Sequence, residues 1–182
     1  MATYGIDIVF RSDIKTTQNQ TPTNPNPVAM AFGYSYLPDT ASESEKGEQG
    51  KRRIQTGSNI QFWLFDLNSN IAPDQKVKEV SIQFRNQDHS VAQCPFKEWD
   101  NGGKTFTPGD KFDPVSGPVQ RDSVGTNISG VQGYTLGKST TSDQSASYPA
   151  VNQGKYEFTV KVTLGNGLLF QVDPEVDIEG AG

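Results

Sequence analysis

The sequence has few of the residues on which catalytic and metal sites most often depend. It contains one histidine, His89, and one cysteine, Cys94. A blue-copper site needs two histidines and a cysteine, and a structural zinc site needs four ligands that are mostly cysteine or histidine. A Ser-His-Asp triad would have to use His89, but the sequence has no Gly-x-Ser-x-Gly elbow, and Asp88 and Ser90 cannot both meet His89 from one strand. We therefore expect no catalytic residue, no bound metal and no cofactor, and we interpret Cys94 as a small buried apolar residue.

Long apolar runs and an excess of positive charge are also absent. No segment approaches the roughly 18 apolar residues that a membrane-spanning helix needs, and the first residues enter a strand pattern without a secretory leader. The net charge of -5 argues against a partner such as duplex nucleic acid. A single cysteine cannot form an intrachain disulfide, so an oxidising compartment is not required. We expect no membrane span, no nucleic-acid partner and a cytoplasmic location, with signal-independent export left open.

Glycine and proline are abundant, whereas apolar residues are sparse. The 182 residues include 18 glycines and 11 prolines, and only 33% are hydrophobic. Apolar residues must therefore be concentrated in short strands that polar connections separate. The longest polar segments are residues 11–27, 38–53 and 137–154. A chain of this length is most simply one domain, so we predict a single domain over residues 1–182.

Alternation of apolar and polar residues predicts the strands. It is clearest in residues 156–164, where every second residue from Tyr156 to Leu164 is apolar, and a Gly165-Asn-Gly167 hairpin turn follows. Similar patterns occupy residues 4–10, 28–37, 60–67, 77–85, 131–136, 168–172 and 173–178, and weaker ones occupy residues 104–107 and 118–122. We predict an all-β fold, a single-domain antiparallel β-sandwich of about eight strands with long polar loops. Periodicity does not separate a sandwich from a barrel.

Residues 60–67 differ from the other expected strands because both of their faces are apolar. Ile60, Phe62 and Leu64 form one face, and Trp63, Phe65 and Leu67 form the other. The second face needs cover, either from a loop of the same chain or from a second subunit. Trp63, Phe65 and Leu67 are therefore candidate residues for a self-association or protein-partner interface.

Three aromatic residues in segments rich in turn formers are candidates for a different kind of site. Carbohydrate-binding β-sandwiches stack loop aromatics on sugar rings, and Trp99, Tyr134 and Tyr148 could serve in this way. Partly buried anchors for the loops are the alternative interpretation.

The densest acidic cluster lies near the end of the sequence. Asp173, Glu175, Asp177 and Glu179 would share one face of a strand at intervals of roughly 7 Å. Such spacing suits a glycosidase acid pair or calcium ligands in principle. We favour a solvated face that discourages edge pairing, with the apolar residues between the acids turned inward.

The two ends of the sequence carry a family resemblance. Its residues are Gly5-Ile-Asp-Ile-Val-Phe10, Asn24-Pro-Asn-Pro27, Gly57-Ser-Asn-Ile-Gln-Phe-Trp63, Tyr156-x-Phe158, Asn166-Gly167 and Asp173-Pro174-Glu-Val-Asp-Ile178. This pattern resembles the bacterial inclusion-body protein family of the PixA/AidA type. The resemblance implies a compact cytoplasmic β-sandwich without an enzymatic role, and it assigns no catalytic residue. We therefore expect a non-enzymatic structural or interaction protein, and the alternative is a carbohydrate-binding module.

Overall fold

The fold is all-β, as the alternating pattern predicts. The computed structural model describes residues 3–13, 30–37, 53–68, 71–86, 94–106, 114–115, 132–137 and 146–180. Two short 3-10 turns, η3 (Pro73–Gln75) and η4 (Asp100–Gly102), interrupt the strands of this part of the chain. No helix within it is both long enough and apolar enough to cross a membrane. His89 and the expected strand at residues 118–122 lie outside the described residues.

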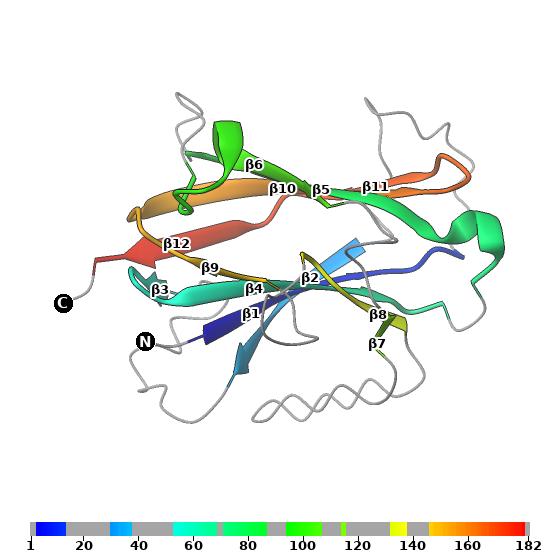
Figure 1. Ribbon diagram of the computed structural model, residues 1–182, viewed down its shortest axis with the longest axis horizontal. Helices are drawn as coiled ribbons and strands as arrows, with labels where there is room; N and C mark the ends of the chain where they lie inside the picture. Colours follow the sequence, from blue (N-terminus) through cyan, green and yellow to red (C-terminus); the bar gives the residue numbers. More distant parts are fainter. Residues whose placement is uncertain are drawn as a thin grey trace.

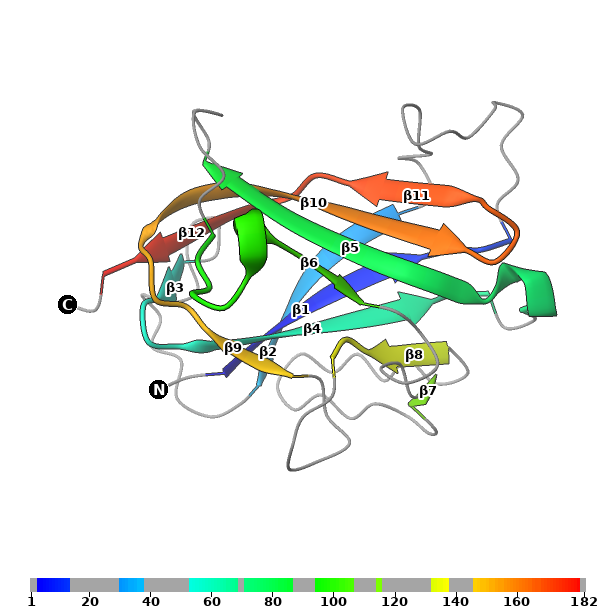
Figure 2. The ribbon, with the colours of Figure 1, turned by 45° about the horizontal axis from the view of Figure 1, so that its top comes forward.

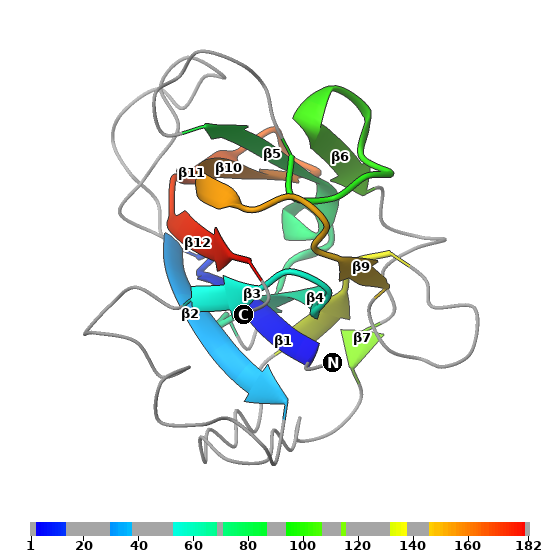
Figure 3. The same cartoon turned by 90° about the vertical axis from the view of Figure 1, so that its left-hand side faces the viewer.

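The strands form two sheets, which Figures 1 and 3 show as two layers. The first sheet has the order β2-β1-β4-β8-β7, and β9 also pairs with β4. Its strands are β1 (Thr3–Phe10), β2 (Met30–Leu37), β4 (Asn59–Asp66), β7 (Pro114–Val115), β8 (Gln132–Thr135) and β9 (Ser147–Pro149). The second sheet has the order β3-β12-β10-β5-β6, and β11 also pairs with β10. Its strands are β3 (Arg53–Gln55), β5 (Val77–Asn86), β6 (Gly103–Phe106), β10 (Gly154–Leu164), β11 (Leu169–Val172) and β12 (Glu175–Glu179).

The strand directions are mixed, so the expectation of a wholly antiparallel fold is wrong. β1 runs parallel to β4, with Thr3 opposite Asn59 and Phe10 opposite Asp66, and β12 runs parallel to β3. The alternation of side chains reports which residues are buried and carries no information about strand direction. A parallel pair needs a long crossover, and residues 11–58 separate β1 from β4.

The described residues hold twelve strands, more than the eight or so that the alternation predicts. β3, β7 and β9 have only two or three residues each. Alternation becomes visible only over four or more residues, so such short strands give no signal.

One cluster of buried apolar side chains lies between the two sheets. β10 supplies five of its members, because every second residue from Tyr156 to Leu164 is at most 1% exposed. Aromatic contacts join the sheets directly, with 6.4 Å between the rings of Phe62 and Phe84 and 5.5 Å between those of Phe10 and Phe170. Burial of large aromatic side chains on this scale is a main source of folding free energy.

A short turn carries the chain from the second sheet to the first, between β3 and β4. Gly57 has a positive φ of 86°, which glycine adopts without steric cost. The backbone N–H of Thr56 donates to the carbonyl oxygen of Glu179, and that of Gly57 donates to the carbonyl oxygen of Ala150. The turn therefore fastens β12 and the residues after β9 to the start of β4. It also helps to position the segment at residues 146–153, in which the Tyr148 ring contacts Trp99.

Candidate functional site

The apolar outer face of β4 is largely covered within the single chain. Trp63 is 8% exposed and Phe65 is 1% exposed, although neither belongs to the core cluster. Leu67, which follows the end of β4, is 41% exposed. The strand is therefore two-faced, as predicted. However, Trp63 and Phe65, two of the three candidate interface residues, are not accessible at the surface. The same chain covers them, which is one of the two alternatives that the sequence leaves open.

The three aromatic residues proposed for sugar stacking are also buried. Trp99, Tyr134 and Tyr148 are 5%, 6% and 6% exposed, and all three belong to the core cluster. This burial favours the alternative interpretation, in which the rings anchor their loops, because each ring turns inward to fill the core. The structure brings Trp99 and Tyr148 together, with 5.1 Å between their centroids and 85° between their planes. Tyr134 lies on β8 opposite Leu64 and takes no part in this pair.

Trp99 lies at the centre of an aromatic cluster. Besides Tyr148, its indole ring contacts four phenylalanine rings at centroid distances of 4.8 to 6.2 Å: Phe62, Phe84, Phe96 and Phe106. The buried indole Nε1–H has no hydrogen-bond partner within the described residues. A buried donor without a hydrogen-bond partner costs about 1–3 kcal/mol of folding stability, and the Trp99 N–H group carries this cost.

The turn that follows Trp99 shapes the surface above it. In η4, Asn101 has φ 48° and ψ 32°, and Gly102 has φ 75°. Two successive residues in left-handed backbone reverse the chain tightly before β6 begins, and asparagine and glycine are the residues that best tolerate this conformation. The sequence Asp100-Asn-Gly-Gly103 predicts a turn. It does not predict the depression that the turn forms beside the edge strand β6.

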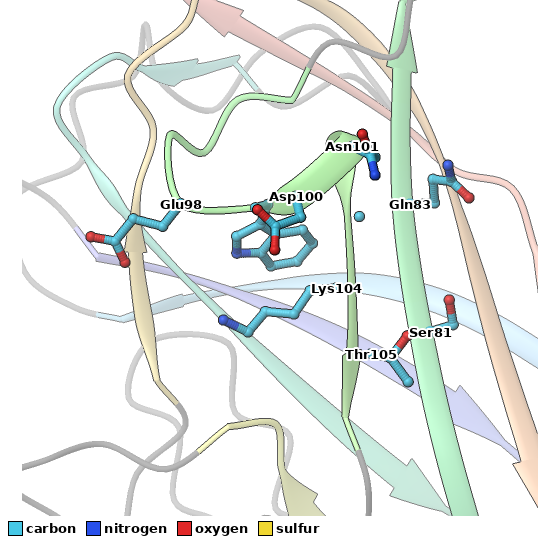
Figure 4. A pocket seen from close by; sticks show the side chains of 9 residues that line it. Ser81, Gln83, Glu98, Asp100, Asn101, Lys104 and Thr105 are labelled. Atoms are coloured by element: carbon cyan, nitrogen blue, oxygen red, sulfur yellow. The ribbon is translucent and has the colours of Figure 1, made fainter.

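We name this depression the Trp99 depression, a hollow of about 430 Å³. Its lining combines carboxylate, amide, ammonium and hydroxyl groups around the indole. It consists of Ser81, Gln83, Glu98, Trp99, Asp100, Asn101, Gly103, Lys104 and Thr105. In Figure 4, Glu98, Asp100 and Lys104 lie on one side of β6, and Ser81 and Gln83 lie on the other side along β5. Figure 2 shows β6 running alongside β5, its antiparallel partner.

Strand register explains how β5 and β6 contribute polar groups. Ser81 is opposite Thr105 and Gln83 is opposite Gly103 in this antiparallel pair. Ile82, between the two polar β5 residues, is fully buried. Alternation along a half-buried strand therefore turns Ser81 and Gln83 outward into the depression.

The charges at the site are unequal in sign. Two carboxylates, Glu98 and Asp100, face one ammonium, Lys104. The Nζ atom of Lys104 lies 5.0 Å from the centroid of the Tyr148 ring, within the range of a cation–π contact. Burial raises the pKa of the Tyr148 hydroxyl to about 12, and the negative charge of Glu98 adds to this effect. The depression is therefore net negative and suits neutral ligands better than anions.

Other candidate groups contribute nothing to this site. Cys94 is buried, as predicted, and burial raises the pKa of its thiol to about 11. Asp173 accepts hydrogen bonds from Thr159 Oγ1 at 2.6 Å and Gln171 Nε2 at 2.9 Å. Val176 and Ile178 are buried, as predicted for the apolar residues between the terminal acids. No group of three or more His, Cys, Asp or Glu side chains that could hold a metal ion occurs in the described part of the chain.

No family model, curated protein or solved structure matches this chain. The geometry of the Trp99 depression is therefore the basis for its proposed function.

Proposed function

We propose that this chain is a non-enzymatic binding protein, a single β-sandwich domain that holds a neutral carbohydrate in the Trp99 depression. The observation that carries the proposal is the set of side chains around Trp99. Carboxylates accept hydrogen bonds from hydroxyl groups, amides both donate and accept, and an ammonium group donates. A sugar is uncharged, and its hydroxyl groups both donate and accept hydrogen bonds, so it can bond to all three kinds of group.

The mode of recognition differs from the stacking that the sequence suggests. The Trp99 ring is nearly inaccessible, so hydrogen bonds from its polar neighbours provide the recognition. Gln83 and Asp100 are exposed and reach the ligand side of the depression. The aromatic cluster beneath holds β5, β6 and η4 in place, and such preorganisation reduces the cost of ordering the site when a ligand binds.

A glycan array tests the proposal. The intact chain is applied to printed neutral and acidic glycans, and each hit is measured by titration calorimetry. We expect neutral glycans among the hits. Gln83→Ala and Asp100→Ala should each weaken binding about tenfold, because each variant removes one buried hydrogen bond from the complex.

The matched control is Glu79→Ala, also on β5, which removes an exposed side chain outside the depression. We expect this variant to bind as tightly as the unaltered chain. If no glycan binds, or if Gln83→Ala and Asp100→Ala bind as tightly as the control, the proposal is wrong.

Self-association is a second candidate function, and the edge strand β2 favours it. Within the described residues β2 pairs only with β1, and its eight residues, Met-Ala-Phe-Gly-Tyr-Ser-Tyr-Leu, include no charge and no proline. Sheet edges that avoid pairing usually carry charged residues or proline, and β2 has neither. Membership of the inclusion-body protein family and a cytoplasmic location belong to this second proposal, since dense accumulation of one protein requires contacts between its copies.

Sedimentation velocity over a range of concentrations tests self-association. Ser35→Lys places a charge on the β2 edge, and Leu67→Lys places one on the exposed residue of the β4 face. Edge pairing predicts that only Ser35→Lys reduces the sedimentation coefficient at high concentration. Reduction by Leu67→Lys alone would instead identify the β4 face, and a monomer at every concentration would exclude both interfaces.

A further inference from the structure

A second depression of about 640 Å³ adjoins the Trp99 depression. The two share Trp99 and Asn101 as lining residues, so they lie on either side of the η4 turn. Asn101 is exposed, and Trp99 is buried beside it. The two depressions are therefore neighbouring parts of one surface and not separate sites on opposite sides of the molecule.

The second depression differs from the first in chemistry. The exposed apolar part of its lining is Val151, which is 45% exposed, and Phe96 lies buried beside it. Polar groups from Lys97, Asn152 and Gln153 border the apolar part. A sugar ring has apolar C–H faces and polar hydroxyl edges, and this combination suits both.

Hydrogen bonds hold the walls of the second depression together. The backbone N–H of Val151 donates to the carbonyl oxygen of Pro95 at 2.8 Å. The Asn152 side-chain Nδ2 donates to the carbonyl oxygen of Cys94 at 2.9 Å, and the Tyr156 hydroxyl donates to the carbonyl oxygen of Asn152 at 3.2 Å. The segments at residues 94–96 and 150–153 are thus fastened to each other and to β10, and the depression is preformed.

Each depression has the volume of a small-ligand site, which is typically about 300–1,000 Å³. A ligand of one or two sugar rings would fill one depression and leave the other open. A chain of sugars could occupy both and pass the η4 turn at Asn101. Both depressions would then bind parts of one ligand. Their binding free energies would add, because the ligand loses its translational freedom only once.

We propose that the two depressions form one extended site for a linear neutral oligosaccharide, with the η4 turn between its two halves. This inference rests on the proposed function, because it assumes that the ligand is a carbohydrate. It adds that the ligand is a polymer segment and that residues outside the Trp99 depression contribute to its affinity.

The test compares oligosaccharides of two lengths by titration calorimetry with the intact chain. The probes are cellohexaose, maltohexaose, xylohexaose and chitohexaose, each with the disaccharide of its series. Gln83→Ala alters the first depression, and Val151→Ser alters the second at an exposed residue. We expect each variant to weaken the hexasaccharide that binds about tenfold. A disaccharide fits only one depression, so its affinity should fall in only one of the two variants.

The outcomes distinguish this inference from the proposed function. Equal affinity for the hexasaccharide and the disaccharide would overturn the extended site and leave carbohydrate binding intact. The same conclusion would follow if Val151→Ser bound the hexasaccharide as tightly as the unaltered chain while Gln83→Ala did not. Absence of binding by every probe would overturn both proposals.

Discussion

Replacement of Trp99 by alanine should lower the free energy of unfolding more than almost any other single change near the site. The indole is 5% exposed and contacts five aromatic rings. Truncation of a buried tryptophan or phenylalanine to alanine costs about 3–5 kcal/mol, because transfer free energy is lost and a cavity remains. Edge-to-face contacts contribute about 0.5–1.5 kcal/mol per pair beyond their buried area.

The loss of an unpartnered N–H group partly offsets this cost. A buried donor without a partner costs about 1–3 kcal/mol, and the variant no longer bears this cost. We therefore expect Trp99→Ala to lower the free energy of unfolding by about 3 kcal/mol in total. Trp99→Phe keeps most of the ring contacts and removes the same N–H group. Its cost should therefore be much smaller, about 1 kcal/mol.

Urea unfolding measures both variants, with Val151→Ala as a control at an exposed side chain. A typical domain has about 5–15 kcal/mol of stability, so Trp99→Ala should shift the unfolding midpoint clearly while the m-value stays constant. The control should change the free energy of unfolding by less than about 0.5 kcal/mol. A cost below about 1 kcal/mol for Trp99→Ala would refute the central position of this ring in the core.

Three further predictions concern other parts of the fold. Asp66 is fully buried, and its Oδ1 accepts two backbone N–H groups at 3.1 and 2.9 Å while its Oδ2 has no partner among the described residues. Asp66→Asn keeps that acceptor and should cost at least about 1 kcal/mol less in urea unfolding than Asp66→Ala, and equal costs would contradict the hydrogen bonds. A Cβ at Gly137 would lie 2.8 Å from the Tyr148 hydroxyl, whereas one at Gly167 would meet nothing within 4 Å, and both glycines have positive φ. Gly137→Ala should therefore lower the thermal midpoint more than Gly167→Ala, and the reverse order would show that the close approach is absent. The raised pKa of the Cys94 thiol, about 11 against 9.0, means that the unfolded chain releases its proton first, so stability should fall from pH 9 to pH 11. Cys94→Ala should flatten that part of the profile of thermal midpoint against pH, and an unchanged slope would contradict the assignment.

The sequence predicts β5 and β10 well because their burial is one-sided. In β10 the polar residues alternate with buried ones without exception, and β5 repeats the pattern through Val80, Ile82 and Phe84. The parallel pairing of β1 with β4 is not predictable in the same way. It depends on contacts between segments almost fifty residues apart, and no local pattern encodes them.

The Trp99 depression is only partly predictable, because it too depends on contacts between residues that are distant in the sequence. Trp99 attracts attention as a rare aromatic residue in a turn-rich segment, but its burial also depends on Phe62 of β4 and Phe84 of β5, which are distant in the sequence. Gln83 and Lys104 are ordinary strand residues in the sequence. They become part of a site only because the antiparallel pairing of β5 and β6 and the η4 turn bring them together.

The most direct test of the Trp99 depression as the ligand site uses the two tryptophan indole N–H signals in a nitrogen-15 correlation spectrum. The chain has two tryptophans, and the spectrum of Trp63→Phe assigns both signals. Cellohexaose, maltohexaose, xylohexaose and chitohexaose are each titrated into the labelled protein. We predict a saturable shift of the Trp99 signal with at least one of them, while the Trp63 signal stays in place. If every titration leaves the Trp99 signal unmoved, or if the Trp63 signal alone moves, the depression is not the ligand site.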